Sequence, residues 1–404
     1  MKKHWKGAVA FGLAVVASST SALAQTRKVS DEEVMRVHRS ALLIDTHNDI
    51  TSKTVEGYDI GKNKDDAHTN IAGYRAGGVG AQFFAVFVGA NYVNGNHSAN
   101  RTLQMIDTVR HDIIAKYPND FQFALRADDI LSAQKQGKIA ALMGIEGGHA
   151  IEDSLRLLRD YYALGIRYMT LTHSNTNNWA DSSGDMDKAG VKHHNGLTPF
   201  GKDVVREMNR LGMIVDISHV ADKTFWDAME VSTAPPFASH SSCRALANVP
   251  RNMTDDMIKA LAKRGGVVQI NFSCDFLSQA TADATKVIMP KMMAAMTGGG
   301  EAKRNELMEQ YRKSVPPATL GDVVEHIDHV KKIAGIDAVG IGSDFDGIFC
   351  APKGLEDVSK FPNLTRALLE KGYSAEDIRK IYGANVLRVM RAVEAESARL
   401  QAKH

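Results

Sequence analysis

Histidines and carboxylates recur along this chain at positions that could together hold metal ions. His47 and Asp49 are two residues apart, and two glycines follow Glu146. Imidazole nitrogen and carboxylate oxygen, without a thiolate, suit Zn²⁺ and, less well, Mn²⁺, Co²⁺ or Fe²⁺. A site with five such ligands has too many for one open catalytic zinc, which takes three protein ligands. Five ligands fit two ions about 3.5–4 Å apart if one carboxylate, that of Glu146, bridges the ions. The candidate residues are His47, Asp49, Glu146, His173, His219, His240, Asp344 and Asp346.

Eight short apolar runs recur along the chain, and we expect them to be strands, most of which end at one of these residues. Most are apolar almost throughout, as in a parallel sheet that is covered on both faces. Helical patterns alternate with them, which favours a (β/α)8 TIM barrel over an open sheet. In such a barrel the strand ends converge on one mouth, and the two-residue period of a strand puts His47 and Asp49 on the same face. The predicted strands are 42–49, 79–88, 139–146, 168–173, 213–219, 236–240, 266–272 and 338–344.

Two stretches interrupt the alternation of strands and helices. Residues 174–196 are polar and follow the predicted fourth strand directly, so we expect a binding loop on the catalytic face. Residues 278–317 form a predicted helical insertion, interrupted by three glycines. Residues 25–404 are otherwise predicted to be a single catalytic barrel, which ends in a helix from Ser374 to about residue 396.

Each candidate residue also has an ordinary interpretation. A lone histidine at a strand end is more often a hydrogen-bonded or surface residue than a ligand, and Asp344 could simply cap a helix. Several strands that independently end in histidine or an acid are harder to explain in this way. Burying these polar and charged groups without partners would cost free energy, and bound metal ions would remove that cost. The joint pattern therefore predicts a metal centre.

The first 24 residues have the three-part pattern of a secretory signal peptide. A basic start is followed by an apolar stretch of about ten residues and by Ala22-Leu23-Ala24. The apolar part is too short to span a bilayer, and no later run approaches the roughly 20 residues required. The tail carries no lipid-anchor signal. We expect export, cleavage near Ala24, and a periplasmic or secreted protein without a stable membrane anchor.

Composition narrows the function further. Charged residues make up 24% of the chain and the formal net charge is +2, with Lys and Arg dispersed, so we expect no nucleic-acid partner.

Cys243, Cys274 and Cys350 form no zinc-type pair and allow at most one disulfide. We expect them to be buried small apolar residues rather than ligands.

The motifs around the candidate residues resemble the membrane (renal) dipeptidases, zinc enzymes of the amidohydrolase superfamily. The resemblance covers nearly all of residues 40 to 395, in order. No single motif would be decisive, but the set is highly specific. The stretches that carry it are Ile44-Asp-Thr-His-Asn-Asp49, Gly144-Ile-Glu-Gly-Gly-His149, Leu171-Thr-His-Ser174, Asp216-Ile-Ser-His219, Ser239-His-Ser-Ser242 and Gly342-Ser-Asp-Phe-Asp-Gly347.

The resemblance implies a role for each residue. His47 and Asp49 resemble the ligands of one zinc, His219 and His240 those of the other, and Glu146 the bridge. Asp344 resembles the acid/base that handles the proton of a metal-bridging hydroxide, with Asp346 left open as an alternative. His173 resembles the residue that binds the substrate and the tetrahedral oxyanion. Arg251 resembles the arginine that holds the substrate carboxylate, against the alternative of a solvated surface charge.

The resemblance also implies dipeptides as substrates, tolerance of a C-terminal D-residue, hydrolysis of carbapenem-type β-lactams in some members, and a homodimer. Two alternatives stay open. One is another amidohydrolase reaction, such as that of a deaminase, an N-acyl amino acid hydrolase or a phosphotriesterase, although those usually place His-x-His on the first strand. The other is a periplasmic binding protein that keeps the fold without catalysis.

Overall fold

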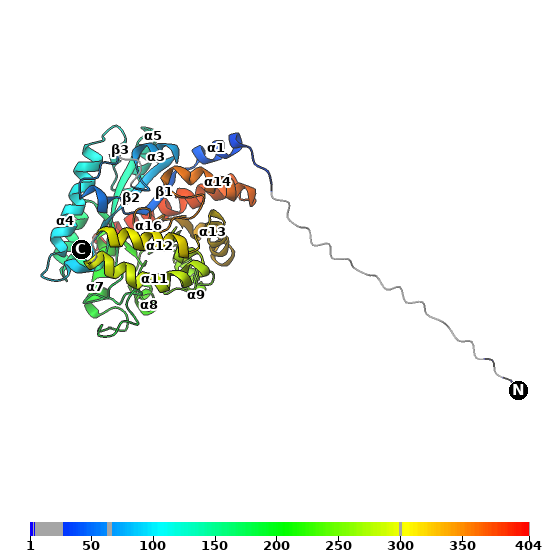
Figure 1. Ribbon diagram of the computed structural model, residues 1–404. Helices are drawn as coiled ribbons and strands as arrows, with labels where there is room; N and C mark the ends of the chain where they lie inside the picture. Colours follow the sequence, from blue (N-terminus) through cyan, green and yellow to red (C-terminus); the bar gives the residue numbers. More distant parts are fainter. Residues whose placement is uncertain (3, 5–26, 63–66, 299–300, 404) are drawn as a thin grey trace.

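Parallel strands form the centre of the protein in the computed structural model (Figure 1), which describes residues 1–2, 4, 27–62, 67–298 and 301–403. Every ladder between them is parallel, as the apolar runs predict. The predicted leader, residues 1–24, lies outside the described residues except for positions 1, 2 and 4. The strands in the described part are β1 (Leu43–Asn48), β2 (Val79–Phe87), β3 (Phe121–Phe123), β4 (Ile139–Glu146), β5 (Ile166–Thr170), β6 (Ile214–Asp216), β7 (Ala238–Ser241), β8 (Val268–Ile270) and β9 (Val339–Ile341).

The strands close into a barrel through two seams. One sheet has the order β1-β2-β4-β5-β6, and a second has the order β7-β8-β9. Single parallel bridges join them, Asp216 to Phe237 between β6 and β7, and Asn48 to Phe345 between β9 and β1. The eight predicted strands are all present in this ring, which confirms the (β/α)8 barrel.

A buried aspartate reinforces each seam. Asp216 accepts hydrogen bonds from Ser239 N (2.8 Å) and Ser239 Oγ (2.6 Å) across the β6–β7 seam. Asp45 accepts the same pair from Ser343 N (2.8 Å) and Ser343 Oγ (2.6 Å) across the β9–β1 seam. At both seams a carboxylate thus takes the place of the backbone carbonyl as acceptor. We call these two arrangements the Asp–Ser clamps.

Three of the predicted strands end three residues earlier than expected. We predicted strands over 168–173, 213–219 and 338–344, each ending at its candidate histidine or aspartate. The observed strands β5, β6 and β9 end three residues before these positions. The backbone of His219 (φ 65°) and of Asp344 (φ 62°) lies in the left-handed region, which cannot continue a ladder. These residues therefore lie on the loops that leave the strands.

The short strand β3 was not predicted. It pairs with Ile139–Ala141 of β4, on the edge that β5 takes over from Met143 onward. Its three residues are too few for an alternating pattern to be recognised in the sequence. It extends the sheet without entering the ring of eight.

Helices surround the barrel, and their ends follow the sequence signals. Ser154 caps α6, which ends at Gly165 in the left-handed region (φ 113°), and Thr254 caps α9. The final helix was predicted to run without interruption from Ser374 to about residue 396. It consists instead of α15 (Ala375–Arg379), a π-helical turn over Lys380–Ala384, and α16 (Asn385–Gln401), which extends beyond the predicted end. The helices are α1 (Asp31–Ser40), α2 (Thr51–Thr54), α3 (Ile71–Ala76), α4 (Ser98–Thr108), α5 (Ala127–Lys135), α6 (Leu155–Leu164), α7 (Pro199–Leu211), α8 (Asp222–Val231), α9 (Asp255–Lys263), α10 (Cys274–Leu277), α11 (Gln279–Gly298), α12 (Glu301–Ser314), α13 (Leu320–Ala334), α14 (Phe361–Glu370), α15 (Ala375–Arg379) and α16 (Asn385–Gln401).

The segment predicted as a helical insertion contains α11 and α12, which lie side by side (Figure 1) and share a small apolar cluster that includes Ile288 and Tyr311. Cys274, at the start of α10, forms a disulfide with Cys350. This is the one disulfide that three cysteines allow, and Cys243 is a free buried cysteine. Cys243 and Cys274 are buried as expected, whereas Cys350 is only partly buried. The pairing joins residues 76 positions apart, so their spacing gives no signal of it.

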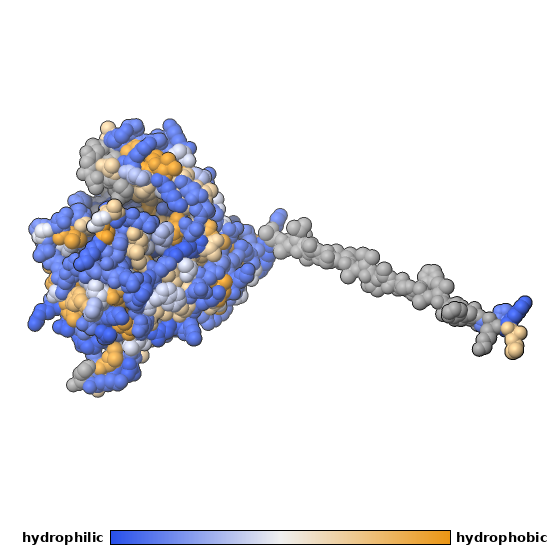
Figure 2. Space-filling model, turned by 90° about the horizontal axis from the view of Figure 1, so that it is seen from below, coloured by the Kyte–Doolittle hydropathy of each residue, from blue (hydrophilic) through white to orange (hydrophobic). Residues whose placement is uncertain are grey.

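The visible face of the molecule in Figure 2 is largely hydrophilic, with small scattered groups of hydrophobic residues. Among the described helices none combines the length and the apolar character needed to cross a membrane.

Candidate metal centre

Glu146 lies at the centre of the predicted ligand set, at the carboxyl end of β4. Its Oε1 atom lies 2.9 Å from His219 Nε2 and 3.2 Å from His240 Nε2. Its Oε2 atom lies 3.5 Å from His47 Nε2. The two oxygens thus face different histidines, which is the geometry of a bridging carboxylate.

The second half of the cluster is built around β1. His47 Nε2 lies 3.2 Å from Asp49 Oδ2, so the two residues share a face as predicted. Donor atoms of His47, Asp49 and Asp344 all lie within 4.8 Å of one another, and so do those of His47, Glu146 and His240, and of Glu146, His173 and His219. The structure therefore brings all five predicted ligands into one cluster.

The protonation preferences of this cluster suit metal ligands. Burial lowers the pKa of His219 and of His240 well below the usual histidine value, and the nearby Arg251 acts in the same direction. Burial opposes ionisation of Glu146, but the imidazole of His47 and those around it hold its pKa well below the usual range. Burial opposes protonation of His47 as well, but Tyr168, Glu146 and Asp49 hold its pKa well above the usual value. His219, His240 and Glu146 therefore favour the forms that bind a cation, a neutral imidazole and an ionised carboxylate, whereas His47 must lose a proton when a cation binds.

Unpaired donor atoms provide an independent test of whether a metal fits. His47 Nε2 is fully buried and makes no hydrogen bond of ordinary geometry, although Asp49 Oδ2 lies 3.2 Å and Glu146 Oε2 3.5 Å away. His219 Nε2 and His240 Nε2 face each other at 3.0 Å and both face the same oxygen of Glu146. Such convergence in a buried site is costly without a cation. The residues therefore fit a metal centre with nitrogen and oxygen ligands.

His173 lies at the edge of the cluster and borders open space. Its Nε2 atom is 3.9 Å from Glu146 Oε1, and its ring packs edge-on against Phe87 at 4.8 Å. Its side chain keeps 23% of its surface exposed, whereas those of His47 and His240 are 0% exposed. It lines a cavity of about 580 Å³ together with Asp49, Glu146, His219, Phe276, Tyr311 and Asp344. This position suits contact with a substrate above the cluster.

Arg251 lies beside the cluster and is not a solvated surface charge. It donates hydrogen bonds from Nη1 to Ser241 Oγ (2.7 Å) and from Nη2 to the carbonyl oxygen of His240 (2.6 Å). Its Nε atom is buried without a partner. Arg251 and His219 both line a second cavity, together with residues 183–188 of the predicted binding loop. A guanidinium with a vacant N–H near the cluster is a suitable partner for an anionic group.

The two aspartates left open by the sequence differ in their contacts. Asp344 Oδ2 accepts a 2.8 Å hydrogen bond from Asn271 Nδ2, and burial, with Asp49 and Glu146 nearby, raises the pKa of Asp344 well above its usual value. Asp346 Oδ1 instead lies 3.2 Å from Lys53 Nζ. Asp344 therefore has the position and the proton affinity of an acid/base at the cluster.

Several supporting residues were not predicted from the sequence. Asn271 follows β8 directly, and its position at the same mouth could have marked it. Tyr168 OH lies 2.7 Å from His47 Nδ1. Ser239 and Ser343 each precede a site residue, and Asp45 and Asp216 lie two and three residues before His47 and His219. That repeated order was a usable signal.

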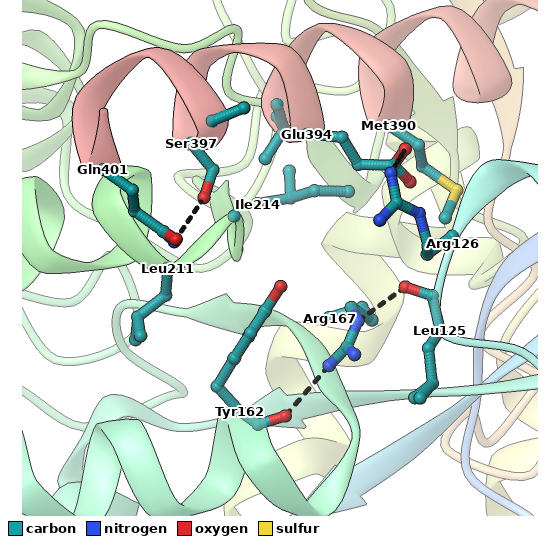
Figure 3. A pocket seen from close by; sticks show the side chains of 13 residues that line it. Leu125, Arg126, Tyr162, Arg167, Leu211, Ile214, Met390, Glu394, Ser397 and Gln401 are labelled. Atoms are coloured by element: carbon teal, nitrogen blue, oxygen red, sulfur yellow. Dashed lines mark hydrogen bonds and ion pairs between the residues drawn. The ribbon is translucent and has the colours of Figure 1, made fainter.

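A third cavity, whose lining residues are drawn in Figure 3, lies at the opposite end of the barrel. It measures about 430 Å³ and contains none of the candidate ligands. Ile214 begins β6, so this cavity borders the amino ends of the strands. Arg167 donates hydrogen bonds there from Nε to the carbonyl oxygen of Leu125 and from Nη1 to that of Tyr162. Because catalytic residues of such barrels lie at the carboxyl ends of the strands, this cavity is not the candidate site.

Comparison with known proteins agrees with this geometry. The model of the membrane dipeptidase family (peptidase family M19) matches residues 31–404. An uncharacterized dipeptidase of Schizosaccharomyces pombe is 36% identical over 400 residues, which cover 94% of this chain and 87% of the relative. The solved structure of a probable dipeptidase, PvdM, from Pseudomonas aeruginosa is 25% identical with a TM-score of 0.78, and covers 91% of this chain and 98% of its own.

A metallopeptidase from Rhodobacter sphaeroides, solved with a phosphinate mimic of the dipeptide L-Ala-D-Ala, has the same fold. Its TM-score is 0.71 at 23% identity, over 87% of this chain and 99% of its own.

Proposed function

This chain belongs to the membrane dipeptidase family, peptidase family M19, a family of metal-dependent dipeptidases, and we propose that it cleaves the amide bond of dipeptides with two zinc ions. His47 and Asp49 would hold one ion, His219 and His240 would hold the other, and Glu146 would contribute one oxygen to each. One observation carries this assignment: the two carboxylate oxygens of Glu146 face different histidines. Oε2 faces His47, while Oε1 faces His219 and His240. Nitrogen and oxygen ligands without thiolate are compatible with zinc.

The chemistry divides between the ions and the side chains. When bound at these residues, two zinc ions would supply the Lewis acidity that makes water a nucleophile near neutral pH and polarises the scissile carbonyl. Asp344 accepts the proton of the attacking water and delivers it to the leaving amine, a role that its raised pKa and its contact with Asn271 support. His173 donates to the developing oxyanion from the cavity wall.

Arg251 gives the reaction its dipeptide character. We propose that its unpartnered Nε–H, with the remaining N–H groups of the guanidinium, binds the free carboxylate of the substrate. A carboxylate one residue beyond the scissile bond is what distinguishes a dipeptide from a longer peptide. Acceptance of a C-terminal D-residue, and of carbapenem-type β-lactams, extends this proposal.

The family match argues against the deaminase, N-acyl amino acid hydrolase and phosphotriesterase alternatives.

Three further proposals concern the export, the location and the oligomeric state of the protein. We propose that residues 1–24 direct export and are removed near Ala24, that the mature protein is periplasmic or secreted without a stable anchor, and that it forms a homodimer. Mass determination of the mature amino terminus and of the native particle tests them.

One experiment tests the central proposal. Purified protein is assayed with L-Ala-L-Ala and L-Ala-D-Ala, with and without chelator, and its metal content is determined. We expect two zinc ions per chain, loss of activity with chelator and recovery with zinc. Fewer than one ion per chain, with no hydrolysis after zinc addition, would instead support the non-catalytic binding protein.

A further inference from the structure

The two Asp–Ser clamps are alike in geometry but differ in what else the serine hydroxyl contacts. Both serines are fully buried, both precede a site residue, and both donate N–H and Oγ–H to an aspartate across a barrel seam. Only Ser239 also contacts an imidazole, because its Oγ lies 2.7 Å from His240 Nδ1. Ser343 precedes Asp344, which has no ring to contact.

The hydrogen-bond inventory around Asp216 determines the direction of this contact. The Asp216 carboxylate accepts from Ser239 N, Ser239 Oγ, Ser218 N (3.1 Å) and Thr170 Oγ1 (2.5 Å). A serine hydroxyl has one hydrogen, and in this clamp it points to Asp216. Ser239 Oγ must therefore accept from Nδ1–H of His240. That tautomer leaves the lone pair of His240 on Nε2, which faces Glu146 Oε1.

A different residue holds the imidazole on the other side of the cluster. His47 Nδ1 lies 2.7 Å from Tyr168 OH, a residue of β5 that is buried in the barrel interior. When a cation binds Nε2 of His47, Nδ1 carries the ring hydrogen, and the Tyr168 oxygen is placed to accept it. His47 Nε2 then faces Asp49 Oδ2 at 3.2 Å and Glu146 Oε2 at 3.5 Å. Each half of the cluster thus has its own support for one histidine.

We infer that Ser239 and Tyr168 are positioning residues, each of which fixes the metal-binding tautomer of one histidine, so that the two metal positions can be weakened separately. Ser239, backed by Asp216, supports the position at His219 and His240, and Tyr168 supports the position at His47 and Asp49. Among the described residues Ser343 contacts no imidazole: besides Asp45, its Oγ contacts only the N–H of Phe345 (3.3 Å) and the backbone carbonyl of His47 (3.4 Å). This inference rests on the proposed two-metal function. Outer partners of ligating histidines typically contribute 10- to 100-fold in metal affinity.

The test compares Ser239→Ala with Ser343→Ala, a matched pair that removes the same hydroxyl from equally buried serines and from the same kind of aspartate contact. Tyr168→Phe is the third variant. Zinc affinity is measured by competition with a chromogenic chelator, and the occupancy of each position by anomalous scattering. Thermal unfolding of the metal-free proteins reports the structural cost of each change.

We expect Ser239→Ala to weaken one ion by about 10- to 100-fold, with occupancy lost at His219 and His240. Tyr168→Phe should lose occupancy at His47 and Asp49. Ser343→Ala should lower the melting temperature of the metal-free protein about as much as Ser239→Ala, while both ions stay within about twofold of wild type. Ser239→Thr, which keeps the hydroxyl, should restore the affected ion.

Equal effects of Ser239→Ala and Ser343→Ala on metal occupancy, or loss of both ions together in either histidine-support variant, would overturn the inference. In that case the proposed function stands, provided that the wild-type protein binds two ions and hydrolyses dipeptides. A wild-type protein that binds fewer than two ions would instead overturn the two-metal function, and the inference with it.

Discussion

Asn271 donates a 2.8 Å hydrogen bond from its side-chain amide to Asp344 Oδ2. The two residues lie 73 positions apart, on the loops that follow β8 and β9, and they meet only because those strands are neighbours in the barrel. The contact leaves Asp344 Oδ1 on the side of Asp49, where both carboxylates border Gly347. One oxygen of Asp344 is thus held while the other borders the ligand cluster.

The first prediction concerns Asp344 as the proton carrier. Asp344→Asn should keep both metal ions but lower kcat roughly a hundredfold to ten-thousandfold, the usual contribution of a general acid/base. Steady-state assays and metal analysis on the same samples check this. Asp346→Asn is the comparison, because that carboxylate pairs with Lys53. A larger loss of kcat in Asp346→Asn than in Asp344→Asn would reverse the assignment.

A second prediction concerns the substrate carboxylate. Arg251→Ala should mainly raise KM, by roughly 10- to 100-fold, since a hydrogen bond to a charged group contributes about 1.5–3 kcal/mol. The same dipeptide with an amidated carboxyl terminus should bind the wild-type protein and the variant about equally. The role of Arg251 as a carboxylate clamp is wrong if KM for the free dipeptide stays unchanged.

Gly144 leads to a third prediction, because a side chain at this position has no room. A Cβ atom there would lie 2.0 Å from Cζ of Tyr168, which supports His47. Gly144→Ala should destabilise the protein by about 1–3 kcal/mol through overpacking, and should also weaken zinc binding. Denaturant unfolding and zinc titration measure the two effects.

Gly321→Ala in α13 serves as the control for Gly144→Ala. Its Cβ would meet only Thr319 Oγ1, at 3.3 Å. Stability and zinc affinity close to wild type in both glycine variants would contradict the steric argument.

The fourth prediction concerns the pH dependence of stability. His326 is buried in α13, where Nδ1 accepts from the N–H of Cys243 (3.0 Å) and Nε2 donates to the carbonyl of Leu277 (3.0 Å). Burial lowers the pKa of His326 to about 4, from 6.5 when unfolded. Between these values the unfolded chain binds more protons, so the free energy of unfolding should fall as pH drops from 6.5 towards 4, by up to about 3 kcal/mol.

His326→Gln should make that pH dependence shallower by the contribution of His326, because glutamine does not titrate, while other buried histidines such as His219 and His240 keep theirs. Urea unfolding of the metal-free protein at pH 7, 6 and 5 measures the slope, and the exposed His111→Gln variant is the control. A slope in His326→Gln as steep as that of wild type would show that other groups are responsible.

The chain itself determined which residues form the centre and which end of the fold they share. His47, Asp49, Glu146, His219 and His240 could be recognised because strand periodicity is local and because parallel strands bring their carboxyl ends together. Helix caps such as Ser154 and Thr254 are equally local, since each contacts only the next few residues. The eight strands of the ring follow from the same short-range patterns.

Only the tertiary structure decided how those residues are oriented and supported. The two oxygens of Glu146 face different histidines, Asp344 rather than Asp346 lies at the cluster, and Cys274 meets Cys350. Asp45 and Ser343 hold a seam closed across 298 positions of sequence. Such contacts depend on which strands become neighbours when the barrel closes. No local pattern records them, because the partners acquire their spacing only in the folded chain.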